Sequence, residues 1–397
     1  MFRAASFLLA AHVFAVSASG SESPDSLKVG LSQLEKGNVE AAYLHLIPSL
    51  SGLNVNQLLR LEQGLAAKKH PYAEFLVLRY HASLGDQFSP VTAKAAESAF
   101  RIGQWTVCRD LLAPHVFELD SVSARLLLMS NFYEGGKLNP VIIRRAASRS
   151  RFTEVQSLAA LNLSLQGSYR EARVYLNRNT PQAIRSYVQA QELAAADKVD
   201  EAAEYFRQSL ETQWPEFKAV ATAELYRHFA LTGNRYKADQ VWNGVKEEVE
   251  ADTLPGTKEL MAHQFALRGY EKQAMFLYRN LYRSGVPRAA VLNALWSEMV
   301  VDDSTGLLSQ IQSLVMSDSL DCDANRLAMR FFRDHQDYPG VVRYGVKTVA
   351  YCPDAVEPYS DVGNALLELR RAVEAKVYFA KYLERGGDRN KVPTYMR

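Results

Sequence analysis

The sequence has few of the features by which enzymes and nucleic-acid-binding proteins are usually identified. It has 3 cysteines, and its 46 Lys and Arg residues nearly balance 44 Asp and Glu residues, so no net field favours a nucleic-acid partner. A phosphate-binding glycine loop, a zinc-protease motif, a nucleophile elbow and a paired-cysteine metal signature are all missing, and the histidines are isolated from one another. These absences exclude the common motif-based enzyme classes. We therefore expect no catalytic, cofactor or metal site.

Long apolar runs are also missing after the first few residues. Residues 4–16 form an apolar run behind Arg3, and small residues follow it. The run is too short to span a bilayer and predicts a secretory signal peptide at residues 1–18, cleaved after Ala18. The alternative is an uncleaved first helix. We expect an exported protein without a transmembrane segment, most simply in a bacterial periplasm.

What the sequence does contain is a repeat. The stretch "LTGNRYKADQVW" at residues 231–242 returns as "LRGYEKQAMFLY" at residues 267–278. Each copy has a glycine, an alanine five positions later and an aromatic residue four positions after that. Related segments place their small or apolar anchor at Ala42, Cys108, Ala172, Ala202, Ala238, Ala274, Val342 and Ala375. The anchors are about 34 residues apart or about twice that, which predicts stacked helical hairpins.

A second position supports the same interpretation. Twelve residues before the anchors stand Gly30, Ala96, Ala160, Ala190, Ala262 and Gly363, while Tyr226 and Arg330 break the rule. Two helices approach closely only where neither carries a bulky side chain. The repeated residues are therefore interpreted as packing positions and not as ligand contacts.

The repeat resembles that of the tetratricopeptide repeat (TPR) family, which has a small residue in its first helix, a glycine turn, then an alanine and an aromatic residue in its second helix. The resemblance implies an all-α right-handed superhelix, or solenoid, of stacked antiparallel helix hairpins, about eleven in number. It is clearest over residues 183–385 and degenerate over residues 19–182, and residues 386–397 are expected to form a loose basic tail. The segments "NPVIIRRAAS" and "DSTGLLSQIQSL" are expected to be second helices of degenerate copies of the repeat. A closed ring of helix pairs, as in some glycosidases, is the rival architecture.

Two of the cysteines fall at complementary ends of one expected hairpin. Cys322 begins its first helix and Cys352 ends its second, and an antiparallel hairpin brings these ends together. A disulfide between them is predicted, and two unpaired thiols are the alternative. Cys108 is interpreted as a small core residue.

The TPR resemblance implies a concave surface, lined by first helices, that binds a segment of a protein partner. Spacing from the anchors gives the groove candidates Arg227, Glu259, His263, Asp334, His335, Asn364 and Glu368. The leading hypothesis is a non-enzymatic exported scaffold in an envelope assembly for secretion, pilus formation or exopolysaccharide export. The alternative is a periplasmic helical-ring glycan hydrolase or lyase. A basic cluster at residues 144–151 is a further candidate for binding an acidic partner or a glycan.

Overall fold

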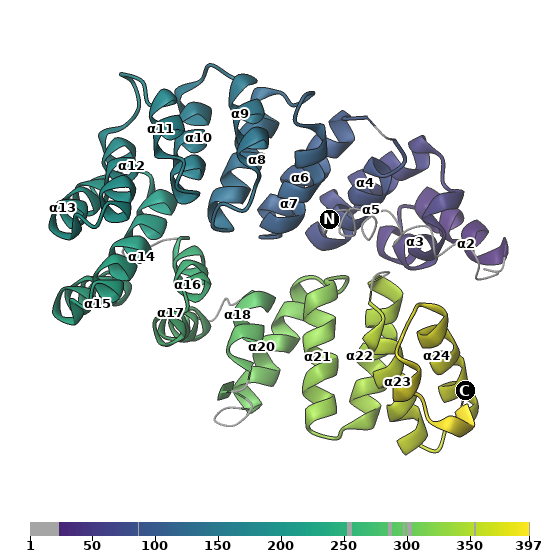
Figure 1. The fold of residues 1–397 in the computed structure, drawn as a ribbon. Helices are drawn as coiled ribbons and strands as arrows, with labels where there is room; N and C mark the ends of the chain where they lie inside the picture. Colours follow the sequence, from purple (N-terminus) through teal and green to yellow (C-terminus); the bar gives the residue numbers. More distant parts are fainter. Residues whose placement is uncertain are drawn as a thin grey trace. The chain divides into compact units, whose positions relative to one another are not determined.

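The computed structural model describes residues 24–85, 87–251, 256–284, 288–296, 298–299, 304–352 and 355–396. The predicted signal peptide at residues 1–18 lies outside the described residues. Throughout the described part the chain consists of helices, turns and bends, without a strand. The predicted all-α class and the stacked antiparallel hairpins are confirmed (Figure 1).

The chain divides into two compact units, which are described separately. Unit 1 comprises residues 1–81, 288–293 and 297–397, and unit 2 comprises residues 82–287 and 294–296. The predicted division at residue 182 separates degenerate repeats from repeats that match the pattern more closely. It falls inside unit 2 and stays a prediction about repeat quality.

Unit 2 is a run of consecutive helices. Its elements are α6 (Pro90–Arg101), α7 (Trp105–Leu112), η3 (Ala113–His115), α8 (Ser121–Tyr133), α9 (Pro140–Ser148), α10 (Thr153–Leu165), α11 (Tyr169–Val174), α12 (Gln182–Ala195), α13 (Val199–Ser209), α14 (Pro215–Leu231), α15 (Arg235–Glu250), α16 (Lys258–Leu267) and α17 (Glu271–Arg283). Each even-numbered helix packs against the odd-numbered helix that follows it, which is the expected hairpin pairing.

Unit 1 combines helices from both ends of the chain. Its elements are α2 (Pro24–Glu35), α3 (Val39–Leu46), η2 (Ile47–Gly52), α4 (Val55–Ala67), α5 (Pro71–Ala82), α18 (Ala289–Ala294), α20 (Ser304–Ser317), α21 (Cys322–Asp334), α22 (Tyr338–Tyr351), α23 (Glu357–Glu368), α24 (Ala372–Glu384), η4 (Arg389–Lys391) and η5 (Thr394–Met396). The hairpins α2–α3, α21–α22 and α23–α24 pack closely. The two segments expected to be second helices of degenerate repeats are helical and form α9 and α20.

The packing interpretation of the repeat is confirmed at most anchors. Ala42, Cys108, Ala172, Ala202 and Ala375 are completely buried. The turn five residues before an anchor has a positive φ, usually on a glycine such as Gly37 or Gly233 and elsewhere on Asp197 or Arg370. Positive φ is the left-handed conformation that ends a helix tightly.

The small residue of the first helix faces the large residue of the second. A Cβ on Gly30 would lie 2.6 Å from a methyl carbon of Leu46, and a Cβ on Gly363 would lie 2.9 Å from the ring of Phe379. Leu46 and Phe379 each lie four residues after an anchor. The glycines therefore make room for these side chains.

The anchor predicted at Val342 lies one residue too far along the chain. Gln336, and not Asp337, has the positive φ at its turn. The buried anchor is accordingly Val341, whereas Val342 is only partly buried. This turn lacks glycine and both candidate anchors are valines, so the sequence did not distinguish them.

The beginning and the end of the chain share one hydrophobic core in unit 1. Leu58, Leu61 and Val77 from α4 and α5 belong to the same buried cluster as Leu320 and Tyr351. The hydroxyl of Tyr43 on α3 donates to the carbonyl oxygen of Tyr351 across 308 residues of sequence, at 3.2 Å. The sequence pattern gave no indication of this packing.

The expectation of a loose C-terminal tail was wrong. Val392 and Met396 are buried against α23 and α24 in the last core cluster. The hydroxyl of Tyr382 accepts a hydrogen bond from the backbone N–H of Asp388 at 3.1 Å. The tail is basic in composition, but two apolar side chains fix it to the last hairpin.

Candidate binding site on the first helices

The predicted groove residues are divided between the two units. Arg227, Glu259 and His263 lie on α14 and α16 of unit 2, whereas Asp334, His335, Asn364 and Glu368 lie on α21 and α23 of unit 1 or directly after α21. The two groups are therefore considered one at a time.

The candidates of unit 1 are exposed surface residues. Asp334 forms ion pairs with Arg330 and Arg333. The ring of His335 stacks on that of Phe331, with the centroids 4.1 Å apart. Asn364 and Glu368 lie on the exposed face of α23. These contacts are local to single helices and do not build a site.

The candidates of unit 2 lead to a buried carboxylate. Glu224 on α14 is 4% exposed. Its Oε1 accepts from Nη1 of Arg227 at 2.6 Å, and its Oε2 accepts from Nε of Arg268 at 2.8 Å. One carboxylate thus holds the guanidinium group of Arg227 on α14 and that of Arg268, which directly follows α16.

The charges in this cluster keep one another ionised. Burial alone would raise the pKa of Glu224, but Arg268 and Arg227 outweigh it and hold the pKa below its ordinary value. Burial would likewise lower the pKa of Arg268, and Glu224 reverses the effect and raises it. Charge-assisted bonds at these distances are stronger than neutral ones. We infer a fixed carboxylate and not one that exchanges protons near neutral pH.

Further hydrogen bonds connect this cluster to neighbouring first helices. Nη1 of Arg268 donates to Oε1 of Gln264 at 2.7 Å, and Nε2 of Gln264 donates to the carbonyl oxygen of Tyr133 on α8 at 2.8 Å. On α12, the amide of Gln191 donates to the hydroxyl of Tyr187 at 3.1 Å, and these two side chains are also bonded to Glu224 and Arg268, respectively. We call Tyr133, Tyr187, Gln191, Glu224, Arg227, Gln264 and Arg268 the inner network. It links first helices of four hairpins.

His263 contacts a second carboxylate beside the inner network. Its Nε2 lies 3.5 Å from Oε1 of Glu134, and its ring meets the Trp105 ring edge-on with centroids 5.2 Å apart. The contact with His263 is the main reason why the pKa of Glu134 is lowered. Glu259 is partly buried on the same helix.

Sequence reasoning found Arg227 and His263 but missed Glu224 and Arg268. A signal for Glu224 was present, because a lone carboxylate in the apolar segment "AVATAELYRHFAL" stands three residues before an arginine. Such a buried acid needs a cationic partner. Arg268 could not be assigned to it, because the two residues lie 44 positions apart.

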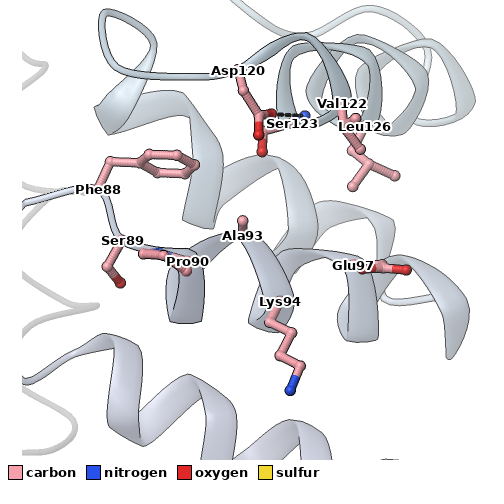
Figure 2. Close-up of a pocket in the computed structure, with 10 residues that line it drawn as sticks. All are labelled: Phe88, Ser89, Pro90, Ala93, Lys94, Glu97, Asp120, Val122, Ser123 and Leu126. Carbon is pink, nitrogen blue, oxygen red and sulfur yellow. Dashed lines mark hydrogen bonds between the residues drawn. The ribbon is translucent and has the colours of Figure 1, made fainter.

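Unit 2 also has a shallow hollow where α6 and α8 begin (Figure 2). Its volume is about 320 Å³. Phe88, Pro90, Val122 and Leu126 supply apolar walls, and the side chain of Asp120 caps α8 by accepting from the backbone N–H of Ser123 at 2.7 Å. The apolar walls of the hollow are suited to an apolar side chain.

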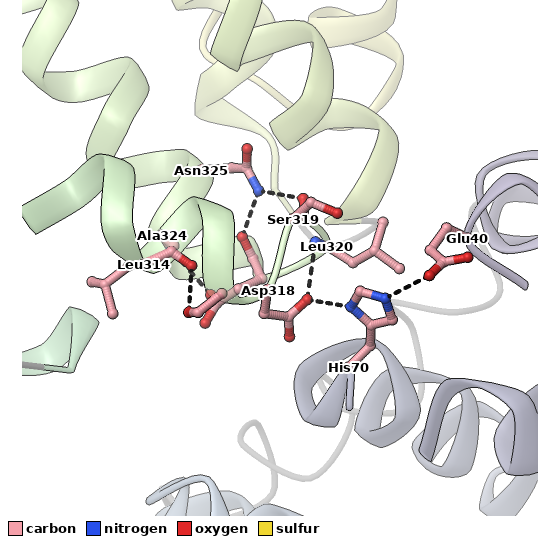
Figure 3. A network of polar contacts seen from close by, with 10 residues as sticks. Glu40, His70, Leu314, Asp318, Ser319, Leu320, Ala324 and Asn325 are labelled. Atoms are coloured by element: carbon pink, nitrogen blue, oxygen red, sulfur yellow. Dashed lines mark hydrogen bonds and ion pairs between the residues drawn. The ribbon is translucent and has the colours of Figure 1, made fainter. Parts of the chain in front are cut away.

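A second polar cluster lies in unit 1, between residues from both ends of the chain (Figure 3). Nδ1 of His70 lies 2.6 Å from Oδ1 of Asp318, and Nε2 lies 3.2 Å from Oε1 of Glu40. Oδ1 of Asp318 also accepts from the backbone N–H of Leu320 at 3.0 Å. A bond from its own backbone amide, supported by His70, lowers the pKa of Glu40. The cluster joins α3, the start of α5 and the end of α20.

The structure pairs Cys322 with Cys352 as a disulfide, with Cα atoms 5.6 Å apart. Cys108 is a free, buried thiol. Oxidation of the pair in the cell stays a prediction.

Within the described residues, no group of three or more His, Cys, Asp or Glu side chains is arranged to hold a metal ion. The helices of that part of the chain all lack the length and apolar character needed to cross a bilayer.

Comparison with known proteins gives similarity of structure only. No family model and no curated protein sequence matches this chain. Similar solved structures include the APC/C hetero-tetramer Cut9–Hcn1, at 13% identity and TM-score 0.28 over 96% of this chain and 90% of that chain. The pentatricopeptide repeat protein PPR10 from maize gives 14% identity and 0.33 over 98% and 65%. The human IFIT1 dimer with PPP-AAAA gives 13% and 0.33 over 96% and 94%. These identities and TM-scores are low, so our description of the fold rests on the hairpins themselves.

Proposed function

We propose that the chain is a non-enzymatic, exported TPR-like scaffold that binds protein components of an envelope assembly, such as a secretion, pilus or exopolysaccharide-export apparatus. The supporting observation is the arrangement of Arg227 on the buried carboxylate of Glu224. The guanidinium group is fixed at one end and its side chain remains 44% exposed. A cation held in place in this way loses little conformational entropy when it binds an acidic group of a partner.

The same arrangement favours binding over glycan cleavage. A glycosidase needs a carboxyl group that still carries its proton near the working pH, and this requires a raised pKa. The pKa of Glu224 is instead lowered by Arg268 and Arg227, and the pKa of Glu134 is lowered mainly by its contact with His263. Both side chains are therefore suited to positioning, and a glycan is retained only as a possible ligand to be tested.

Affinity capture from the native envelope tests the proposal. The full chain, the Arg227→Glu variant and the matched variant Arg235→Glu would be crosslinked before capture. Arg235 is exposed on the second helix α15, so its replacement makes the same charge change outside the inner network. We expect crosslinks on α14 and α16 and a loss of partner with Arg227→Glu alone. Equal recovery with all three chains, or crosslinks only on second helices, would contradict the proposal.

Export is tested separately by fusing residues 1–30 to a reporter enzyme that is active only outside the cytoplasm. We expect activity from this fusion and none when residues 1–18 are deleted. Equal activity of the two fusions would show that residues 1–18 are not an export signal.

A further inference from the structure

The first helices α8 and α10 of unit 2 run parallel and begin at the same edge. Nδ2 of Asn131 on α8 donates to Oδ1 of Asn162 on α10 at 2.6 Å, and Nδ2 of Asn162 donates to the carbonyl oxygen of Leu128 at 2.9 Å. These bonds join residues that lie at about the same distance from the start of each helix. The segments that lead into α8 and α10 therefore lie next to each other.

Both segments present an exposed aromatic side chain. Phe117 precedes α8 and is 61% exposed, and Phe152 precedes α10 and is 69% exposed. The guanidinium carbon of Arg145, from the last turn of α9, lies 5.2 Å from the centroid of the Phe117 ring. We call Phe117, Arg145, Arg149, Arg151 and Phe152 the edge patch.

The loop of the edge patch is held in one conformation. Nε2 of Gln156 donates to the carbonyl oxygens of Ala147 and Ser150, at 2.8 and 2.6 Å. The backbone N–H of Phe152 donates to Oγ of Ser150 at 3.1 Å. These bonds fix the C-terminal end of α9, so the arginines and Phe152 project from a rigid base. Pre-organisation of this kind favours binding.

The positive charge of the edge patch is not balanced locally. Arg145, Arg149 and Arg151 are exposed and form no ion pair with any residue that the structure describes. The nearby carboxylates are already engaged, Glu171 by Arg144 and Glu154 by Arg125. Three guanidinium groups without an ion pair, beside two exposed aromatic rings, combine residue types that are enriched at protein interfaces.

We propose that the edge patch binds an extended acidic segment of a protein partner that also carries an aromatic or large aliphatic side chain. Carboxylates of the segment pair with Arg145, Arg149 and Arg151, and its apolar side chain packs on Phe117 and Phe152. The hollow of Figure 2, which also begins at the N-terminus of α8, offers room for a second apolar side chain. This surface is separate from the inner network, so failure of either proposal leaves the other intact.

Fluorescence anisotropy with the full chain tests the edge patch. The probe is a short labelled peptide in which glutamates alternate with phenylalanine and serine, and the control peptide has glutamine in place of glutamate. The triple variant Arg145→Glu, Arg149→Glu, Arg151→Glu should bind the probe about tenfold more weakly or worse. The matched triple variant Arg170→Glu, Arg178→Glu, Arg235→Glu changes three other exposed arginines of unit 2 and should stay within about twofold of the natural chain.

A second variant separates packing from charge. Phe117→Ala with Phe152→Ala should weaken the probe several-fold, whereas Tyr236→Ala, which removes an aromatic side chain 73% exposed on α15, should not. Equal weakening by both triple variants would show general attraction between charges and overturn the proposal. Tighter binding of a heparin oligosaccharide than of the peptide, lost in the same triple variant, would identify a glycan site and also overturn it. Circular dichroism of each variant verifies that it is folded.

Discussion

At the scale of single residues, Glu224 combines deep burial with two cationic partners on different helices. Replacing a buried charge leaves its buried partners without a counter-charge. The resulting loss of folding stability exceeds that for an exposed ion pair. Glu204 provides the comparison, because it forms an ion pair with Arg207 on the surface of α13. Glu224 is buried with two arginine partners, whereas Glu204 is exposed with one.

We predict that Glu224→Gln lowers the free energy of unfolding by about 3 kcal/mol, since Arg268 then remains buried without a counter-charge. Glu204→Gln should change it by less than about 0.5 kcal/mol. Urea unfolding followed by circular dichroism measures both. Similar values for the two variants would contradict the structural role of Glu224.

The same measurement has a pH dependence with a definite sign. The pKa of Glu224 is lower in the folded protein than its ordinary value of 4.5. Its contribution to stability is therefore present above that value and is lost as the pH falls through the folded pKa. The difference between the natural chain and Glu224→Gln should shrink accordingly in acid.

The cysteines give a prediction about reactivity. Burial raises the pKa of the Cys108 thiol to about 12, so little thiolate forms at neutral pH. Titration with a thiol reagent should find no reactive thiol in the native protein, one after denaturation, and all 3 after denaturation with reductant. Three thiols in the denatured, unreduced protein would contradict a bond between Cys322 and Cys352.

At the scale of helices, the small positions decide how closely a hairpin packs. Gly363→Ala places a Cβ 2.9 Å from the completely buried ring of Phe379 and should lower the thermal stability of unit 1, by about 1–2 kcal/mol. Gly244→Ala on α15 places its Cβ in open space and should raise the stability of unit 2 by up to about 1 kcal/mol through helix propensity. The melting temperatures of the two variants test this prediction. A higher melting temperature for Gly363→Ala would show that α23 and α24 leave room for a methyl group at residue 363.

The C-terminal tail belongs to the last hairpin as part of its core. Val392→Ala with Met396→Ala should destabilise the α23–α24 hairpin by about 3 kcal/mol, because both side chains are buried there. Tyr395→Ala should have little effect, since Tyr395 is 75% exposed. Hydrogen exchange of the α24 amides measures the local change. Unchanged exchange in the double variant would mean that the tail is not packed in solution.

At the scale of the whole molecule, unit 1 depends on residues from both ends of the chain. His70 and Asp318 meet there at 2.6 Å, beside the core that Tyr43 and Tyr351 share. We predict that Asp318→Asn increases hydrogen exchange of α5 and α20 amides, corresponding to about 1–3 kcal/mol of lost local stability. Asp334→Asn replaces an exposed acid that follows Asp318 in the sequence. It should leave the hydrogen exchange of both helices unchanged.

The sequence predicted the hairpins because their packing is local. A small residue such as Gly363 and its large partner Phe379 lie within one repeat, so the requirement recurs along the chain and becomes visible as a period. The core that Leu58 and Leu61 share with Leu320 does not recur along the chain. Each of these residues is an ordinary apolar position, and nothing in its neighbours specifies a partner so far along the chain. The same reason hid the pairing of Glu224 with Arg268.

The packing of Tyr43 against Tyr351 has a consequence for biogenesis. Residues 39–80 leave the ribosome early, but some of the side chains that complete their core lie between residues 320 and 355 and are made much later. Contacts this distant in sequence slow folding and leave apolar surface exposed in the meantime. Unit 1 is therefore completed only after nearly the whole chain has been synthesised. Any nascent chain released before about residue 355 should be a substrate for chaperones and proteases.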